Sequence, residues 1–389
     1  MGRPERVSAD TRPTSRTQIS AARRIVVKIG SSSVTRDDGG LDLNRLDMVA
    51  RTVSRMLDSG TSVAIVSSGA VAAGAGTVGL RGRPKNLQEA QAAAAAGQGL
   101  LMAQWSAAFQ MNRHRVAQVL LTVGDLLRRR HYQNAQETLG YLLDRGLVPI
   151  VNENDVVVTD EIRFGDNDRL AALVAQAIHA DLLVILTDVD ALYDRPPSEP
   201  GARRLETISG AKQFEAVTVT GRGSQFGTGG MMTKLAAARS AVAAGVPVLL
   251  AGADNFDGAI AGADTGTWFS ATGARRATRM SWLASAALPT GTVQVDSGAA
   301  RALTEDGSSL LAAGVTGVSG TFEAGSVVEI VGYDAVIARG ISGYSAAEIL
   351  QMAGKQSVQL RSESGERIRP VVHRDDLVVL KYPQPSNNL

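Results

Sequence analysis

Two lysines lie in settings that favour contact with an anion. Lys28 is inside the apolar run 24–29 and is followed by Gly30 and three serines. An ammonium group is costly to bury without an anionic partner, although a lysine that reaches solvent from a surface strand is an alternative for this residue taken alone. Lys234 follows Gly227-Thr228-Gly229-Gly230-Met231-Met232-Thr233. If that glycine-rich segment opens a helix, its free N–H groups can bind an anion. A cation in the first turn of a helix opposes the helix dipole, and a bound anion would offset the cost of placing Lys234 there.

Carboxylate and amide side chains gather in two further segments. Asn152-Glu153-Asn154-Asp155 directly follows the apolar run 148–151, and Gly165-Asp166-Asn167-Asp168 follows ten residues later. Such a set of side chains could bind a metal ion or hold an α-ammonium group. A tight turn is a third alternative for the first segment. The spacing alone does not choose among these alternatives.

Motifs of several other enzyme classes are misplaced or absent. The run Gly74-Ala75-Gly76-Thr77-Val78-Gly79 fits the dinucleotide pattern, but it begins seven residues after the preceding apolar run, whereas that fingerprint begins at the strand end. The triplet His373-Arg374-Asp375 lacks the asparagine and the Asp-Phe-Gly of a protein kinase. No Gly-Lys-Ser or Gly-Lys-Thr occurs, so a Walker A loop is excluded. Another scaffold must hold any phosphate group.

The composition excludes further classes of site. Lys and Arg total 40 against 38 Asp and Glu, so nucleic acid is not the expected main partner. The absence of cysteine excludes disulfides and thiolate chemistry, and 4 histidines argue against a multi-histidine metal site. No apolar run approaches the roughly 20 residues of a membrane span. The polar residues 1–21 lack a secretory apolar stretch and are expected to be a disordered basic extension of a cytoplasmic protein.

The elements that position these residues follow from the apolar spacing. Strands are predicted near 24–30, 62–67, 116–121, 148–151, 182–186 and 247–250, with helices near 42–59, 87–111, 131–145, 168–179 and 233–244. This alternation predicts an α/β fold with a mostly parallel open sheet sandwiched by helices. Ligands of such sheets bind at the carboxyl ends of the strands, so the loops after the strands are the expected site.

The pattern changes near residue 285. Short strands are predicted at 292–295, 326–330, 335–340 and 376–380, with helical segments near 298–304 and 345–352 and frequent glycines. These residues predict a small β-rich, barrel-like module. The expected limits are 22–272 for the α/β domain, 273–287 for a linker and 288–383 for the second module.

Taken together, the chemical segments resemble the amino acid kinase family, and the C-terminal module resembles a PUA domain. The resemblance spans about residues 24–383 and rests on these segments in this order: 27–31, 67–70, 152–155, 165–168, 187–188 and 227–234. It is nearest to members that use ATP to phosphorylate the side-chain carboxylate of L-glutamate to L-glutamyl 5-phosphate, the first step of proline biosynthesis. Members acting on acetylglutamate, aspartate or carbamate are the nearest alternative, and RNA binding through the PUA-like module is a more distant one.

The resemblance implies a role for each site residue. Lys28 and Lys234 would neutralise the transferring phosphoryl group, and Asp168 would orient both. Substrate contacts would come from Ser68, Gly69, Ala70, Asp155, Asp166 and Asn167. The nucleotide would be held by Lys28, Thr187, Asp188, Thr228, Gly229, Gly230, Met231, Met232, Thr233 and Lys234.

The implied reaction fits this residue set. Glutamate and ATP carrying Mg²⁺ are the expected substrates, and no protein-held metal is expected. A carboxylate nucleophile is already ionised at neutral pH, since its reference pKa is about 4.3, so no general base is needed. Transfer then depends on positioning and charge stabilisation. The family also implies inhibition by proline and a homodimer or homotetramer. Because the acyl phosphate product hydrolyses readily, a fairly closed site or its fast hand-off to glutamyl phosphate reductase is expected. Residues 156–165 are expected to form a lid.

Overall fold

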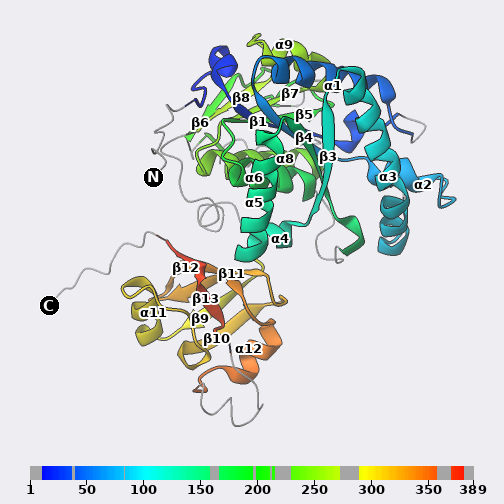
Figure 1. The fold of residues 1–389 in the computed structure, drawn as a ribbon. Coiled ribbons are helices and arrows are strands. Elements are labelled where there is room, and N and C mark those ends of the chain that lie inside the picture. Colours follow the sequence, from blue (N-terminus) through cyan, green and yellow to red (C-terminus); the bar gives the residue numbers. More distant parts are fainter. Residues whose placement is uncertain are drawn as a thin grey trace, which may run out of the picture. The chain divides into compact units, whose positions relative to one another are not determined.

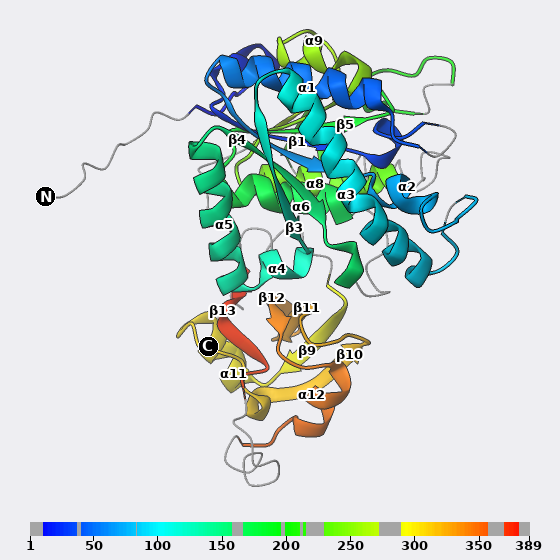
Figure 2. The same ribbon diagram turned by 45° about the vertical axis from the view of Figure 1, so that its right-hand side comes forward.

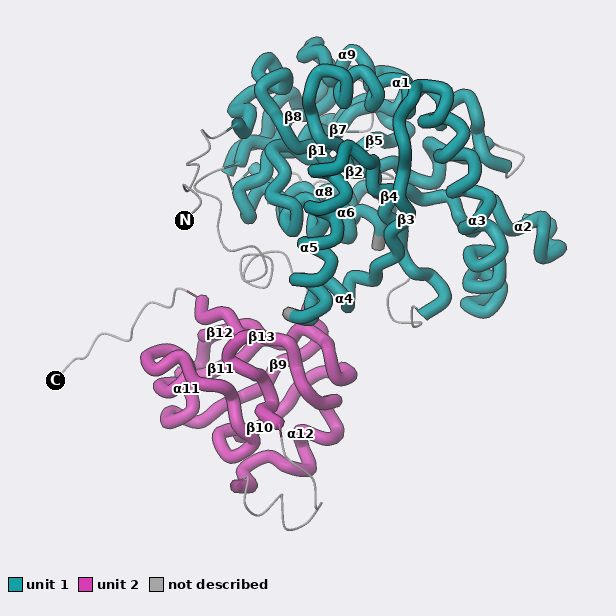
Figure 3. The backbone as a smooth tube through the Cα atoms, in the orientation of Figure 1, with its two compact units in different colours: residues 1–276 teal, residues 277–389 magenta. Residues whose placement is uncertain are grey.

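A computed structural model of the 389-residue chain divides into two compact units, residues 1–276 and 277–389 (Figure 3). The structure describes residues 11–36, 40–82, 84–157, 166–195, 199–210, 213–214, 229–271, 289–356 and 369–380. The division at 276 lies within the predicted linker 273–287, all of which is outside the described part. The two units are considered separately below.

An eight-stranded sheet forms the centre of the first unit over the described residues (Figure 1). Its order is β3-β4-β2-β1-β5-β7-β8-β6, and neighbouring strands are parallel except for β7 and β8. This confirms the predicted mostly parallel sheet, while β6 and β8 were not predicted. The strands are β1 (Arg24–Ile29), β2 (Ser62–Ser67), β3 (Arg115–Leu121), β4 (Leu147–Glu153), β5 (Leu182–Thr187), β6 (Thr207–Ser209), β7 (Val248–Gly252) and β8 (Thr267–Ser270).

Helices cover both faces of this sheet (Figures 1 and 2). The first face carries α1 (Leu43–Asp58), α3 (Leu87–Met111) and α9 (Phe256–Ile260), and the second carries α5 (Arg129–Asp144), α6 (Asp166–Ala177) and α8 (Gly229–Ala243). Shorter helices are α2 (Ala70–Ala75) and α4 (Val123–Leu127). Among the described residues, no helix has both the length and the apolar character needed to cross a membrane.

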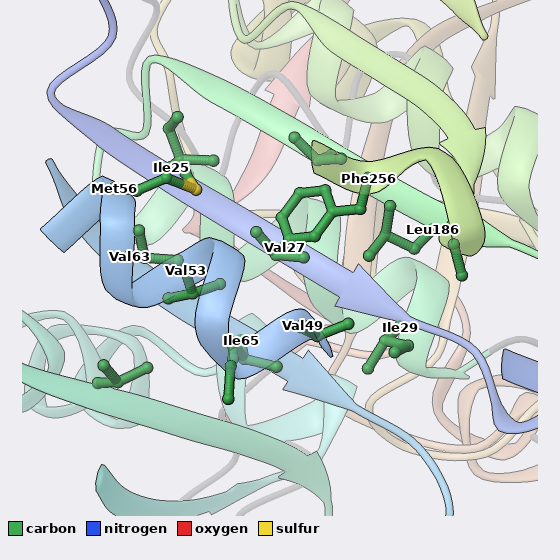
Figure 4. Packing of buried hydrophobic residues seen from close by; sticks show 14 of the residues in the cluster. Ile25, Val27, Ile29, Val49, Val53, Met56, Val63, Ile65, Leu186 and Phe256 are labelled. Atoms are coloured by element: carbon green, nitrogen blue, oxygen red, sulfur yellow. The ribbon is translucent and has the colours of Figure 1, made fainter. Parts of the chain in front are cut away.

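Side chains of β1 point alternately to the two faces of the sheet, so the sequence of β1 determines which residues lie on each face. Ile25, Val27 and Ile29 are buried in one hydrophobic cluster with Val49 and Val53 of α1 (Figure 4). Successive side chains of a strand point to opposite faces of the sheet. Lys28 therefore projects toward the opposite face, where α6 packs against β1. The hydrophobic pattern that builds the core thus also aims the lysine.

Residues 11–21 are ordered, which differs from the expectation of a disordered extension over 1–21. A short 3₁₀ helix forms at Arg16–Ala21, and Ile19 is 2% exposed within the main hydrophobic cluster. Arg16 forms an ion pair with Asp264 and donates to the carbonyl of Glu206 at 2.7 Å. The expectation was wrong because one apolar residue anchors an otherwise polar segment. Residues 1–10 lie outside the described part.

The second unit is built on a five-stranded sheet, which confirms the predicted β-rich module. Its order is β10-β9-β11-β12-β13; β9 and β11 are parallel, and the other neighbours are antiparallel. The elements are β9 (Gly291–Val295), α11 (Ser297–Thr304), β10 (Val315–Gly320), β11 (Val327–Gly332), β12 (Ala335–Ser342), α12 (Ala346–Met352) and β13 (Val372–Val379). Strand β10 was not predicted, because its Gly-Val-Ser-Gly sequence resembles a turn.

Candidate active site

Four adjacent parallel strands bring the predicted segments to one edge of the sheet. In the order β4, β2, β1 and β5 all carboxyl ends lie on the same side. Asn152 and Glu153 end β4, Ser68 follows β2, Lys28 is the penultimate residue of β1, and Thr187 ends β5. Residues far apart in sequence therefore meet where a parallel sheet binds its ligands.

A buried ion pair joins β1 to α6. The Lys28 Nζ lies 2.6 Å from the Asp168 Oδ1, and the two side chains are 6% and 4% exposed. Burial lowers the pKa of Lys28, and the neighbouring Asp168 carboxylate counteracts that effect. A buried cation needs such a partner, because removing it from water alone is costly. The pair therefore holds a positive charge in one place inside the site.

The first two turns of α8 bring a second cation to the same carboxylate. The Lys234 Nζ lies 3.9 Å from Asp168 Oδ2 and donates to the Gly230 carbonyl at 3.1 Å. The Thr233 hydroxyl donates to Asp168 Oδ2 at 2.7 Å. Helix α8 begins at Gly229, earlier than the predicted 233, so Lys234 lies in its second turn rather than its first. Asp168 thus contacts both lysines and a hydroxyl.

A neutral hydrogen-bonded cluster lies beside this charged group. The Asn167 Nδ2 donates to Ser68 Oγ at 3.1 Å and to Asn152 Oδ1 at 3.2 Å. The backbone N–H of Glu153 donates to Asn167 Oδ1 at 3.2 Å. Both polar ends of the Asn167 amide are therefore engaged, which fixes its orientation. The cluster ties α6 to β4 and to the loop after β2.

Two members of this cluster were missed as site residues. Asn152 is 1% exposed, and its Nδ2 donates to the Oε1 of Gln98 on α3 at 2.8 Å. Asn152 belongs to the first polar segment, but no role was assigned to it. Gln98 follows Gly97 in an alanine-rich helix. An amide beside a glycine within an alanine-rich helix is the signal that the sequence offers, and it is a weak one.

The loop after β2 depends on a glycine. Gly69 has φ +112°, and a Cβ there would lie 2.9 Å from the Val34 side chain. A non-glycine residue would therefore be strained and would clash. Ala70 begins α2 and is 2% exposed. Gly74 contacts Gly97 across the α2–α3 interface, where an added Cβ would meet backbone at 2.0 Å, so helix packing accounts for that glycine of the misplaced dinucleotide pattern.

Asp155 is a candidate for binding a cationic group. It lies in a short 3₁₀ turn at Asp155–Val157, and burial raises its pKa to about 6. Residues 158–165, most of the expected lid, lie outside the described part, as does Thr228. Asp166 begins α6 and Gly229 begins α8, and only their backbone positions are described.

The end of β5 supplies the other predicted nucleotide contacts. Thr187 is 2% exposed and donates to Asp188 Oδ1 at 2.9 Å, while Asp188 is exposed. The negative charge of Asp188 raises the pKa of Lys28, so the two groups share one electrostatic environment. Met231 and Met232 follow Gly230 along α8 and are half-buried.

The donor set fits a polyphosphate better than a protein-held metal. Two lysines and the glycine-rich start of α8 supply positive charge and N–H groups at one strand edge. Within the described ranges, no group of three or more His, Asp and Glu could hold a metal ion. A divalent cation would then arrive bound to the nucleotide, as is usual for Mg²⁺.

Comparison with known proteins identifies relatives over nearly the whole chain. The model of the amino acid kinase family matches residues 23–252, and a PUA domain model matches 291–363. A protein of Streptomyces coelicolor named glutamate 5-kinase is 50% identical over 94% of this chain and 98% of its own length. One of Salinispora arenicola with the same name is 48% identical over 94% of this chain and all of its own. The chain belongs to the amino acid kinase family and carries a C-terminal PUA domain.

Proposed function

We propose that this chain transfers the γ-phosphoryl group of ATP to the side-chain carboxylate of L-glutamate, the first step of proline biosynthesis. The observation that carries the proposal is Asp168, which contacts both Lys28 and Lys234 at the strand edge. Asn167, the preceding residue, belongs to the neutral hydrogen-bonded cluster. The names and high identity of the relatives support glutamate as the acceptor.

The two lysines carry the charge of the transfer. Both the attacking carboxylate and the phosphate are anionic, so electrostatic stabilisation and positioning are what the protein must supply. Lys28 and Lys234 contact the phosphate oxygens from β1 and α8. Asp168 lies against both lysines and orients them, and its charge raises the pKa of Lys28 against the effect of burial. Mg²⁺ bound to ATP supplies further charge neutralisation. No residue acts as a general base, because the glutamate carboxylate is already ionised.

The neutral cluster and Asp155 hold the acceptor. Ser68 Oγ, which the Asn167 amide holds in place, can donate a hydrogen bond to a carboxylate. The backbone of Gly69 and Ala70 can approach closely because position 69 has no side chain. Asp155, once ionised, pairs with the α-ammonium group, and Asp166 supports it. This arrangement orients the acceptor so that its far carboxylate faces the lysines.

The adenine-nucleotide side lies between β5 and α8. Thr187 ends β5 and Asp188 follows it. The segment that leads to Lys234 at the start of α8 is Thr228, Gly229, Gly230, Met231, Met232 and Thr233. The N–H groups at the start of α8 contact phosphate oxygens, as helix N-termini commonly do. The half-buried methionines pack against the nucleotide.

Further properties are proposed on family membership. They are a homodimer or homotetramer, a cytoplasmic location and inhibition by proline. Hand-off of the acyl phosphate to a reductase is proposed because that product hydrolyses readily. Inhibition is tested by titrating proline at a glutamate concentration near its KM. Loss of rate that glutamate reverses supports the proposal, and an unchanged rate contradicts it.

A substrate panel tests the main proposal. ADP release is followed by a coupled assay with glutamate, acetylglutamate, aspartate or carbamate as the acceptor. We expect glutamate to give the highest kcat/KM by at least about a hundredfold, since a site built to bind a polar group rejects analogues that cannot make the same bonds. A higher value for any other acceptor would overturn the substrate assignment.

A further inference from the structure

The loop that follows Asp188 is packed between two neighbouring strands. Its residues Ala191 and Leu192 are 1% and 3% exposed, although the flanking Asp188 and Asp190 are exposed. The loop runs on to Tyr193, which pairs with Arg204 in an isolated bridge. The buried residues Ala191 and Leu192 show that the loop packs against the strands on its inner side, and two contacts there hold it.

One of these contacts is a buried hydroxyl on β8. Thr267 is 0% exposed, and its Oγ1 accepts a hydrogen bond from the backbone N–H of Leu192 at 2.9 Å. This bond satisfies an N–H that is shielded from water, and a buried N–H without an acceptor is costly. Thr267 lies beyond residue 252, where the match to the amino acid kinase family model ends. No role was assigned to it from sequence.

The second contact is a close approach from β7. A Cβ on Gly252 would lie 3.3 Å from the Asp190 Cα and 3.6 Å from the Val189 carbonyl oxygen. The loop therefore rests directly on the backbone of the strand end. Its far side is held as well, because Leu205 N–H donates to the Leu192 carbonyl at 2.8 Å. Three contacts therefore hold the loop: Gly252 of β7, Thr267 of β8 and the backbone of Leu205.

We infer that Thr267 is a positioning residue for nucleotide binding. By accepting the hydrogen bond from Leu192 N–H, its hydroxyl holds the loop that carries Asp188 in place above β8. The inference rests on the proposed function, in which Thr187 and Asp188 line the nucleotide site. Thr267 itself is buried beneath the loop and acts through Leu192. Without the hydroxyl, Leu192 N–H is left without an acceptor unless the loop shifts. A shift of the loop moves Asp188, and ATP binding becomes weaker. In the strand order, β4 and β2 of the acceptor side are separated from β8 by β1, β5 and β7.

The test is Thr267→Val, which keeps the shape and removes the acceptor, beside Thr267→Ser, which restores it. We expect the valine variant to raise the KM for ATP about tenfold, the size of one lost hydrogen bond to a buried group. The KM for glutamate should stay within about twofold. The serine variant should return the KM for ATP to within about threefold of the original. Direct titration with the ATP analogue AMP-PNP, without any acceptor, should show the same order.

A matched control separates positioning from stability. Thr52 on α1 is 2% exposed, and its hydroxyl accepts from Arg55 at 3.2 Å, so Thr52→Val also removes a buried threonine hydroxyl. We expect this variant to lower the unfolding midpoint without raising the KM for ATP. Gly252→Ala displaces the same loop from the other strand without leaving a buried group unpaired. It should raise the KM for ATP even if Thr267→Val does not fold.

The outcomes distinguish this inference from the proposed function. If the unmodified chain binds AMP-PNP but Thr267→Val binds it equally well, the positioning role is wrong and the proposed function stands. A proportional rise in both KM values would also overturn it, because that pattern is general structural damage. If the unmodified chain binds no AMP-PNP, the proposed function fails and the inference fails with it. Activity on another acceptor would leave the AMP-PNP comparison intact.

Discussion

Two adjacent residues at the start of α6 face two chemically different environments. Asp168 is buried against Lys28 and close to Lys234, so its surroundings are charged. Asn167 is bonded to Ser68, Asn152 and the backbone of Glu153, so its surroundings are neutral hydrogen-bonding groups. One helical turn therefore divides the site into a charged half and a neutral half.

The difference between these halves matches what each must bind. A transferring phosphoryl group accumulates negative charge, and fixed cations stabilise it most effectively where water is excluded. An amino acid must be recognised by the directions of its hydrogen bonds, and amides and hydroxyls provide those without repelling a carboxylate. Changes in the charged half should therefore act mainly on kcat, and changes in the neutral half mainly on the KM for glutamate.

The largest effect is expected from Lys28→Met. It removes one cation and leaves the buried carboxylate of Asp168 with a weaker partner. We expect kcat to fall at least about a thousandfold and the free energy of unfolding to fall by about 3–5 kcal/mol. Turnover and urea unfolding measure the two effects. The double variant Lys28→Met with Asp168→Leu should recover stability but not activity, and recovered activity would contradict the charge role.

Lys234→Ala should separate activity from stability. Asp168 keeps Lys28 and the Thr233 hydroxyl, so no buried charge is left alone. We expect kcat to fall about 100–1000-fold, corresponding to about 2.7–4 kcal/mol of transition-state stabilisation. Unfolding should change by less than about 1 kcal/mol. The control is Arg239→Ala, an exposed cation on the same helix, which should leave kcat unchanged. Near-normal turnover in Lys234→Ala would remove this lysine from the mechanism.

Asn167→Asp tests the neutral half. The shape is retained, but the donor to Ser68 and Asn152 becomes an acceptor that repels a carboxylate. We expect the KM for glutamate to rise at least about tenfold, with the KM for ATP within about twofold. Initial rates over a matrix of both substrates measure this. Equal rises in both KM values would show that the halves are not separate.

The smallest effect concerns pH. Burial raises the pKa of Asp155 to about 6, so this carboxyl becomes neutral as the pH falls below that value. A neutral carboxyl cannot pair with an ammonium group. We expect the KM for glutamate to rise about tenfold between pH 7 and pH 5, as the ionised fraction of Asp155 falls. Asp155→Asn should have a raised KM that varies little with pH. A parallel pH dependence in both proteins would exclude Asp155 as the cause.

Much of the charged half could be predicted from local sequence. Lys234 follows a glycine-rich segment and signals an anion by itself, whereas Lys28, a cation in an apolar strand, left a solvent-reaching lysine as an alternative. The partners of the neutral half could not be predicted in this way. Gln98 lies 54 residues from Asn152 in the chain, and an amide in an alanine-rich helix gives no local sign of its partner.

Local sequence patterns were enough to predict the α/β class, the β-rich second module and the strand-end position of the polar segments. Apolar periodicity and glycine placement are local properties, and they carry that information. The folded chain, by contrast, was needed to show that Ile19 anchors residues 11–21 and that Thr267 lies beneath the loop after β5. It also brought Asp168 into contact with both lysines. These contacts join distant segments, and strand order and helix packing, which no local pattern encodes, bring them together.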